Sequence, residues 1–283
     1  MSHIDPEILS LDIGDLELPY LHYPGDGPVL LLLHATGLLP WLWHPIARRL
    51  GSRYRIIAPF FCGHRDSDPG RGGVSWMDLA RDVAALCEKL SITPSYLAGH
   101  SMGATVITIA HAELGLAAER MVLIEPIFLP EFVYKTGMPV EHHPLASRSL
   151  KRRNAWGNRD EALAYLKSKK MFAGWDGEML DLYVRYGMVP GSGGGLELTC
   201  NPRHEASLFM GGLHFNPWPL LPGIECPVLL VEGGTSENKN FIDLQKIKSL
   251  LPRGEYRQVG NAGHLVPQER PEEVAAIFMD FFR

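Results

Sequence analysis

One serine lies in a pattern that would make it a nucleophile. Ser101 is the central residue of G-H-S-M-G at residues 99–103, and a short apolar run, residues 96–98, precedes it. This G-x-S-x-G pattern is typical of a nucleophile elbow, a tight strand-to-helix turn that holds the serine hydroxyl clear of the backbone. Gly99 and Gly103 fit such a turn, because a side chain at either place would crowd the neighbouring strand and helix. The pattern therefore predicts that Ser101 is a nucleophile.

The same five letters also occur in ordinary Gly-Ser turns, so the flanking sequence must decide between the two interpretations. Residues 96–98 read as a buried strand. After the turn, an apolar stripe at helical spacing is formed by Thr105, Val106, Ile109 and Ala110. A strand directly before the serine and a helix directly after it favour the nucleophile elbow.

Alternating strands and helices are expected to position this serine. The continuous aliphatic run at residues 29–33 is typical of a strand that helices cover on both faces of a sheet. Further strands are expected at 7–13, 16–23, 55–58, 121–124, 228–231 and 255–259, and helices at 42–50, 241–251, from Pro271 onward, and after the capping box that begins at Ser75. This alternation predicts an α/β fold with a doubly wound, mostly parallel sheet.

The alternation stops for about a hundred residues between Pro126 and Pro227. Helical segments are expected there at 160–171 and 176–186, followed by a flexible glycine-rich stretch at 191–195 and a short helix that Asn201-Pro202 opens. The sheet pattern then resumes. The sequence thus predicts a core domain of residues 1–126 and 225–283, with a helical cap, residues 127–224, inserted over the carboxyl edge of the sheet.

Composition and charge limit the classes of function. The 283 residues, 46% of them hydrophobic, suffice to bury a full core. A formal net charge of -5 gives no support to a nucleic-acid partner, which usually requires a basic face. No apolar run approaches the roughly 18 residues of a membrane helix, and the first residues lack the features of a signal peptide. We therefore expect a cytoplasmic protein with a small-molecule substrate, no membrane span and no nucleic-acid partner, and the sequence leaves its oligomeric state open.

The cysteines and histidines show no metal-binding pattern. No C-x-x-C pair occurs among the four cysteines, which are Cys62, Cys87, Cys200 and Cys226. We therefore expect four reduced thiols rather than a zinc site or a disulfide scaffold. The adjacent His142 and His143 lie in a loop-like stretch, where solvated side chains are expected. No metal ion or other cofactor is predicted.

Three further stretches, together with the elbow, resemble the α/β-hydrolase superfamily along essentially the whole chain. Residues 34–37, H-A-T-G, are similar to its H-G-x-G oxyanion turn, and residues 61–67, F-C-G-H-R-D-S, resemble its R-G-H-G-x-S loop with Arg65 in place of a glycine. Residues 260–264, G-N-A-G-H, look like its histidine loop. The segments 124–127 and 263–267 and the long cap are more narrowly similar to the group with fungal peroxisomal lipase-like and toxin-biosynthesis hydrolases. The resemblance implies the α/β-hydrolase fold and the serine hydrolase branch.

The resemblance also implies the partners of the serine. His264 stands on the loop where the superfamily keeps its general base, and a serine hydroxyl needs an imidazole to accept its proton during attack. Two glutamates compete for the acid. Glu237 follows the strand after the cap, where most of the superfamily has an aspartate, and Glu125 ends the strand before the cap, where some haloalkane dehalogenases place theirs. The pattern of the lipase-like group favours Glu125, with Glu237 as the alternative.

Main-chain groups are expected to bind the negative charge that develops on a substrate carbonyl. Met102 follows the nucleophile at a helix N-terminus, and Thr36 lies in the early turn, so their N–H groups are the predicted oxyanion hole. His34 and His100 are expected at the pocket wall without transferring protons. The aromatic residues expected to contact substrate are Trp43, Phe128, Trp156, Trp175 and Trp218.

These features predict a serine hydrolase that cleaves an ester or a similar acyl bond of a small, largely apolar substrate. Two alternatives stay open: hydrolysis of a carbon–carbon bond in a ring-cleavage product, which uses the same triad, and a ligand-binding protein of this fold with little turnover. Dehalogenase and epoxide hydrolase activities are disfavoured, because those chemistries use an aspartate where Ser101 stands. The natural substrate and the pathway are not predicted.

Overall fold

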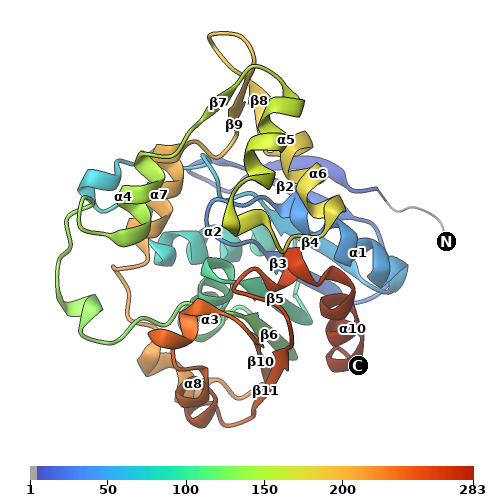
Figure 1. Ribbon diagram of the computed structural model, residues 1–283. Coiled ribbons are helices and arrows are strands. Elements are labelled where there is room, and N and C mark those ends of the chain that lie inside the picture. The colour runs from blue at the N-terminus through green and yellow to red at the C-terminus, as the bar shows by residue number, and fades with distance from the viewer. Residues whose placement is uncertain (1–4) are drawn as a thin grey trace.

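Within residues 5–283, which the computed structural model describes, eight strands form one large sheet (Figure 1). In chain order these strands are β1 (Glu7–Asp12), β2 (Glu17–Tyr23), β3 (Val29–Leu33), β4 (Arg55–Pro59), β5 (Tyr96–His100), β6 (Arg120–Ile124), β10 (Val228–Gly233) and β11 (Gly254–Val259). Across the sheet the order is β1-β2-β4-β3-β5-β6-β10-β11. The pairs β1–β2 and β2–β4 are antiparallel, and every pair from β4 to β11 is parallel. The predicted α/β fold with a mostly parallel sheet is therefore confirmed.

Alternate residues of the central strands enter two different hydrophobic layers. Leu30 and Leu32 of β3 pack in the layer that contains α1 (His44–Leu50) and α10 (Pro271–Phe281). Leu31 and Leu33 pack in the layer that contains α2 (Trp76–Lys89) and α3 (Met102–Leu114). Successive side chains of a strand point to opposite faces, so helices on both faces bury all of them. This burial explains why the sequence of β3 is a continuous aliphatic run.

Side-chain caps determine where two of the expected helices begin. The Ser75 hydroxyl accepts a hydrogen bond from the first turn of α2, as the capping-box pattern predicts. The helix expected at 241–251 is shorter than predicted: α8 (Leu244–Leu250) begins after Asp243, whose carboxylate accepts a hydrogen bond from the Lys246 N–H. A 3-10 turn, η7 (Glu237–Asn240), lies between β10 and α8 in the chain.

Between β6 and β10 the chain leaves the large sheet and forms α4 (Pro144–Leu150), α5 (Arg159–Lys167), α6 (Gly177–Tyr186) and α7 (Pro202–Gly211). This segment lies in the upper and left parts of Figure 1. It also contains a small antiparallel sheet in the order β7 (Ala155–Trp156), β9 (Leu196–Leu198) and β8 (Met188–Pro190). The segment contains four α-helices, and the small sheet is a feature that the sequence does not predict. The cap boundaries at 127 and 224 stay a prediction.

The glycine-rich stretch 191–195 is the turn of a hairpin rather than a separator between helices. It joins β8 to β9, and Gly194 and Gly195 have φ values of 83° and 77°. Glycine adopts such conformations at little steric cost, which suits a tight turn between antiparallel strands. The short strands were hard to predict because each has only two or three residues.

His143 is a helix cap and not a solvated side chain, which corrects the expectation from its loop-like sequence. It is buried, and its Nδ1 accepts hydrogen bonds from the N–H groups of Leu145 and Ala146 at 3.2 Å each. Burial lowers the pKa of His143, which favours the neutral imidazole that can accept these bonds. His142 beside it is exposed, as expected.

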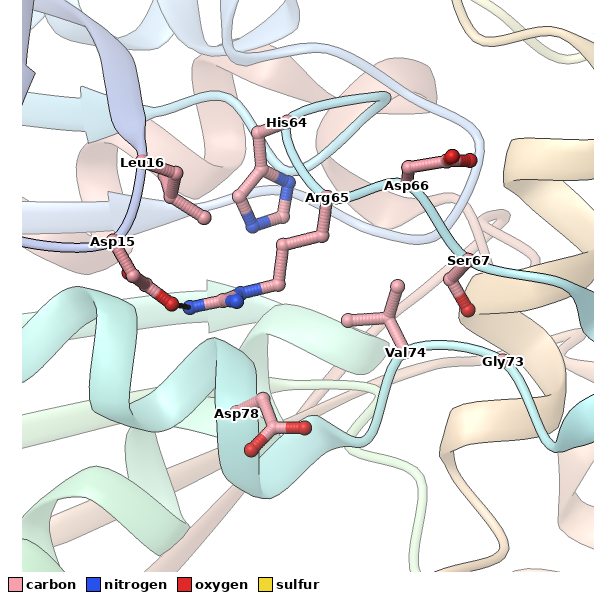
Figure 2. Close-up of a pocket in the computed structure, with 9 residues that line it drawn as sticks. All are labelled: Asp15, Leu16, His64, Arg65, Asp66, Ser67, Gly73, Val74 and Asp78. Carbon is pink, nitrogen blue, oxygen red and sulfur yellow. Dashed lines mark ion pairs between the residues drawn. The ribbon is translucent and has the colours of Figure 1, made fainter.

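Arg65, which replaces a glycine of the R-G-H-G-x-S-like loop, is anchored by two carboxylates. Its Nε donates to Asp82 at 2.9 Å, and its NH2 group lies 3.0 Å from the Asp15 carboxylate. Burial raises the pKa of Asp82, but hydrogen bonds from Arg65 and His64 outweigh burial and leave that pKa below its usual value. Figure 2 shows Arg65 and Asp15 beside a cavity of about 430 Å³, whose lining includes none of the residues predicted to act on a substrate.

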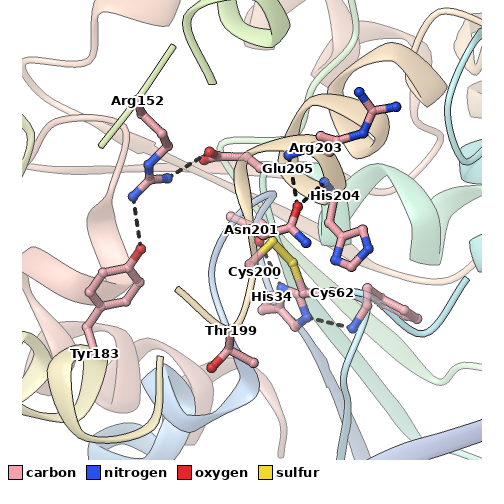
Figure 3. Close-up of a disulfide and its surroundings, with 12 residues drawn as sticks. His34, Cys62, Arg152, Tyr183, Thr199, Cys200, Asn201, Arg203, His204 and Glu205 are labelled. Carbon is pink, nitrogen blue, oxygen red and sulfur yellow. Dashed lines mark hydrogen bonds and ion pairs between the residues drawn. A yellow bond between two sulfur atoms is a disulfide. The ribbon is translucent and has the colours of Figure 1, made fainter. Parts of the chain in front are cut away.

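Cys62 and Cys200 form a disulfide, so the expectation of four reduced thiols is wrong for this pair (Figure 3). Their Cα atoms are 5.2 Å apart, although 138 residues separate them in the sequence. Cys62 lies in the loop after β4, and Cys200 directly precedes Asn201, which caps α7. The bond therefore ties the segment between β6 and β10 to a loop of the large sheet. Cys87 and Cys226 are free thiols.

Candidate active site

Ser101 occupies the turn between β5 and α3, with φ at 55° and ψ at -118°. A positive φ is rare for residues other than glycine, and such strained residues are common at functional sites. The turn is also closely packed. A Cβ atom on Gly99 would lie 2.5 Å from the Ala104 nitrogen, and one on Gly103 would lie 2.3 Å from the Leu33 oxygen. The structure thus agrees with the predicted need for both glycines.

His264 approaches Ser101 from the loop after β11. Its Nε2 lies 3.0 Å from the Ser101 Oγ. The side chain of His264 is 27% exposed, whereas Ser101 is only 7% exposed. The distance between Oγ and Nε2 is short enough for a proton to pass between them, and Ser101 itself has little contact with solvent.

His100, the residue before the serine, makes a hydrogen bond to the loop that carries His264. It is fully buried, and its Nε2–H donates to the main-chain oxygen of His264 at 2.9 Å. Burial lowers the pKa of His100 well below its ordinary value, so the ring is neutral at physiological pH. His100 thus contacts the loop that carries His264, and the expected contact with substrate stays a prediction.

Glu125 lies on the other side of the imidazole. Its Oε2 is 3.0 Å from His264 Nδ1, and its side chain is 2% exposed. The same carboxylate accepts hydrogen bonds from the Gly233 N–H at 2.7 Å and from the Ser236 hydroxyl at 2.8 Å. Glu125 has a φ of 49°, a strained value for this residue type. These donors fix the carboxylate where it can accept the imidazole N–H.

Glu237 lies away from the imidazole. Its side chain is 81% exposed and forms an ion pair with Lys170, whose side chain is 92% exposed. The structure therefore brings Glu125, and not Glu237, to His264.

The two N–H groups predicted for the oxyanion hole have no acceptor in the structure. Within residues 5–283, neither the Thr36 N–H nor the Met102 N–H donates a hydrogen bond. Met102 begins α3, and the first N–H groups of a helix lack intrahelical partners and favour negative charge. Thr36 follows β3, whose last residues contact the elbow at Gly103. Free donors at these places are what an oxyanion hole requires.

His34 holds the turn that contains Thr36. Its Nδ1–H donates to the Ala35 oxygen at 2.8 Å, and its Nε2 accepts the Phe61 N–H at 3.0 Å. Burial lowers the pKa of His34 to about 4, so the neutral ring can make both bonds at once. Because His34 is buried in this role, its expected contact with substrate stays a prediction.

A charged group of the cap contacts the same turn. A Cβ atom on Gly37 would lie 2.3 Å from Oε1 of Glu205, which belongs to α7. The other oxygen of Glu205 accepts a hydrogen bond from Arg152 at 2.7 Å, and Arg152 lies 3.3 Å from the Tyr183 hydroxyl (Figure 3). The segment between β6 and β10 therefore meets the turn that contains Thr36 and Gly37 through a polar cluster.

The aromatic residues expected to contact substrate are buried among other rings. Trp43 lies 6.2 Å from Phe278 of α10, between ring centres, which places it in the core of the large sheet. The other four pack as Phe128 with Trp218, Trp156 with Tyr165, and Trp175 with Tyr183. This packing gives no support to a substrate contact for Trp43, and for the other four that contact stays a prediction.

Two polar residues at the site, Ser236 and Asn238, are not predicted by the sequence pattern. Ser236 donates to Glu125, and the side-chain amide nitrogen of Asn238 lies 2.8 Å from His264 Nδ1. The Gly-Gly-Thr-Ser turn at 233–236 could have indicated them. A turn directly after a parallel strand lies at the carboxyl edge of the sheet, where the site is expected.

No metal-binding cluster and no membrane-spanning helix occur within residues 5–283. No group of three or more histidine, cysteine, aspartate and glutamate side chains is placed to hold a metal ion in this part of the chain. None of the helices described there has the length and apolar character to cross a membrane.

The fold, the elbow and the contacts of His264 lead to one class of protein. The sequence profile of the alpha/beta hydrolase family matches residues 30–277. The chain therefore belongs to the alpha/beta hydrolase family, as the sequence resemblance implies.

Named relatives are similar to the chain over most of its length. It is 26% identical to 2-(acetamidomethylene)succinate hydrolase of Mesorhizobium japonicum over 262 residues, 93% of this chain and 90% of that protein. It is 25% identical to N-formylmaleamate deformylase of Pseudomonas putida over 265 residues, 93% of this chain and 91% of that protein. The chain is also 38% identical to the magnesium-chelatase 30 kDa subunit of Rhodobacter capsulatus, but over only 84 residues, 29% of this chain and 30% of that protein.

Solved structures agree on the fold. The crystal structure of E-2-(acetamidomethylene)succinate hydrolase is similar with a TM-score of 0.82 and 24% identity, over 98% of this chain and 99% of that one. A likeness at this identity shows the shared fold. The narrower similarity to fungal lipase-like and toxin-biosynthesis hydrolases stays a prediction.

Proposed function

We propose that this protein is a serine hydrolase that cleaves an acyl bond, an amide or an ester, of a small molecule. The observation that carries the proposal is the unbroken chain of contacts from Ser101 Oγ through both nitrogens of His264 to Glu125, with distances of 3.0 Å at each step. Serine, histidine and a carboxylate in this order form the triad of nucleophilic acyl transfer. Ser101 is the nucleophile, His264 the general base and Glu125 the acid.

The proposed reaction has two halves, acylation of Ser101 and hydrolysis of the acyl-enzyme. Both halves use the same contacts of His264. His264 Nε2 accepts the Ser101 proton while Oγ attacks the substrate carbonyl carbon, and the carbonyl oxygen becomes negative. The N–H groups of Thr36 and Met102 donate to that oxygen. His264 then returns the proton to the leaving amine or alcohol as the acyl bond breaks. Water attacks the acyl-enzyme in the same way, and His264 passes its proton back to Ser101. Glu125 stabilises the imidazolium in both halves.

Amides of small metabolites are the first substrates to test, and esters the second. The two full-length relatives are named for an acetamido compound and for removal of a formyl group, which supports bonds of the amide type. The restricted exposure of Ser101 supports a small substrate. The polar cluster of Arg152, Glu205 and Tyr183 beside the oxyanion turn supports a substrate with polar groups rather than a purely apolar one.

The test combines an active-site probe with a substrate panel. A fluorophosphonate should label wild-type protein at Ser101 and leave Ser101→Ala unlabelled. The panel contains N-acyl and N-formyl amides, p-nitrophenyl esters of increasing chain length, and ring-cleavage products with a labile carbon–carbon bond. We expect turnover of an amide or ester that Ser101→Ala abolishes. Turnover of ring-cleavage products alone would contradict the proposal, and absence of both labelling and turnover would favour a ligand-binding protein.

A further inference from the structure

Asn238 places its amide against the same imidazole nitrogen that faces the acid. The amide nitrogen lies 2.8 Å from His264 Nδ1, and Glu125 Oε2 lies 3.0 Å from that nitrogen. Asn238 belongs to the turn η7, and its main-chain N–H donates to Ser236 Oγ, which in turn donates to Glu125. The Nδ1 atom of His264 therefore has two polar neighbours, a carboxylate and an amide, which are themselves linked through Ser236.

One ring nitrogen cannot serve both neighbours in the same protonation state. When Nδ1 carries the hydrogen, it donates to Glu125, and Nε2 is free to accept the proton of Ser101. When Nδ1 has a lone pair, the NH2 group of Asn238 can donate to it. In that tautomer Nε2 carries the hydrogen and cannot act as the base. The contacts of Nδ1 therefore determine whether His264 is in its reactive tautomer.

The stronger of the two contacts should prevail. A hydrogen bond to a carboxylate is about twice as strong as one between neutral groups, so the tautomer that donates from Nδ1 to Glu125 is favoured. An N–H on Nδ1 would then face the NH2 group of Asn238, which is a repulsive contact. A side-chain amide presents an oxygen and a nitrogen of nearly the same shape, so half a turn replaces the NH2 group by Oδ1. Oδ1 is then a second acceptor for the Nδ1–H.

Resting on the proposed serine hydrolase function, we propose that Asn238 is a positioning residue that holds His264 in its reactive tautomer, and that a carboxylate at position 238 can take over from Glu125. The geometry supports the second part because the amide of Asn238 is as close to Nδ1 as Glu125 is. Asn238 is partly exposed and sits on a turn, so an aspartate of almost the same shape fits without a buried unpaired charge.

The experiment uses substitutions at position 238 in two backgrounds. Asn238→Leu, similar in size but without polar atoms, should lower kcat about five- to tenfold with KM unchanged, the size expected for one neutral hydrogen bond. In a Glu125→Gln background, Asn238→Asp should restore turnover about a hundredfold over Glu125→Gln alone. In the wild-type background, Asn238→Asp should move the acidic limb of the kcat/KM profile to higher pH, because a second carboxylate stabilises the imidazolium.

Asn240→Asp is the matched control. It adds the same charge two residues further along, on an exposed residue whose amide donates to the Glu237 oxygen. It should neither restore turnover nor move the pH profile. Restoration by Asn240→Asp equal to that by Asn238→Asp would overturn the proposal, because a general electrostatic effect would then suffice. So would Asn238→Leu with kcat within about twofold of wild type.

Two measurements separate this proposal from its premises. Thermal midpoints and circular dichroism of each variant test folding, and if Asn238→Leu is destabilised, the Asn238→Asp restoration decides the question. If wild type shows no turnover and no labelling of Ser101, the proposed function has failed. If wild type is active, Ser101→Ala is inactive and the position-238 variants behave as their backgrounds do, then only the role of Asn238 is refuted.

Discussion

Replacing Glu125 by glutamine tests the proposed acid most directly, because its hydrogen bonds determine how the glutamine must sit. The Gly233 N–H, 2.7 Å from Oε1, can only donate, so the glutamine oxygen must face it. The NH2 group is then directed to Ser236 and to His264 Nδ1. An NH2 group at Nδ1 requires a lone pair there, which places the imidazole hydrogen on Nε2, against Ser101. The substitution therefore selects the unreactive tautomer.

The expected loss follows from that tautomer. The equivalent acid-to-amide change in a serine protease lowers kcat by about 10⁴-fold, or roughly 5 kcal/mol of transition-state stabilisation. We expect a similar fall in kcat for Glu125→Gln on a substrate that wild type turns over well, with a small change in KM. The assay is steady-state kinetics over a range of pH values, beside the thermal midpoint of each variant.

Glu237→Gln is the matched control, since it makes the same chemical change on the other candidate acid. Glu237 is exposed and pairs with the exposed Lys170, so its loss should leave kcat within about threefold of wild type. A severe loss in Glu237→Gln with a mild one in Glu125→Gln would refute the reasoning. Mild effects in both variants would show that the tautomer of His264 does not depend on either carboxylate.

Three further predictions concern the nucleophile, the disulfide and a buried histidine. Ser101→Ala should lower turnover at least about a thousandfold without lowering the thermal midpoint, because the hydroxyl serves chemistry more than folding; a variant that keeps a tenth of the wild-type rate would contradict this. A non-reducing peptide map should recover Cys62 linked to Cys200. Cys200→Ser should lower the free energy of unfolding by up to about 5 kcal/mol, because the disulfide no longer closes the loop between the two cysteines. Cys226→Ser, the control at a free thiol, should leave that free energy unchanged. Burial lowers the pKa of His34 to about 4. Between about pH 6.5 and pH 4 the unfolded chain therefore binds a proton at this residue that the folded chain does not. The free energy of unfolding should fall by about 3 kcal/mol as the pH drops through that window. Denaturant titrations of wild type and His34→Gln should show a flatter fall in the variant, and equal slopes would exclude His34 as the cause.

Short-range signals explain why much of the site could be predicted from the sequence. The elbow combines a strand, two glycines and a helix within about fifteen residues, and each part has its own pattern. The structure shows the physical reason for the glycines, since a Cβ atom at either would overlap backbone atoms. The loop with His264 follows the last strand, so the parallel sheet itself brings it to the edge where Ser101 lies. In both cases local sequence and sheet direction are enough.

Contacts between distant segments explain what the sequence did not predict. The disulfide forms because the segment before α7 packs against the loop after β4. The spacing of Cys62 and Cys200 in the sequence does not indicate that contact. Asn238 meets the imidazole because η7, the turn after β10, comes close to the histidine loop in the folded chain. His143 reads as a loop residue, since an imidazole is an uncommon helix cap. Each of these interactions is set by tertiary packing rather than by local pattern.

The order of the strands explains how Glu125, at the end of β6, reaches His264. Strand β6 lies between β5 and β10, and the hydrogen-bond register continues past the strand ends: the Ser101 N–H donates to the Ile124 oxygen at 2.9 Å, and the Glu125 N–H donates to the Val231 oxygen at 2.8 Å. Ser101, Glu125 and the Gly233 N–H that anchors the Glu125 carboxylate therefore stand at the ends of three neighbouring strands. The turn after β10 reaches the same imidazole nitrogen with the amide of Asn238. Both strand ends thus border Nδ1 while Ser101 and His264 stay in place, so moving a carboxylate from one strand to the other requires no change in the fold.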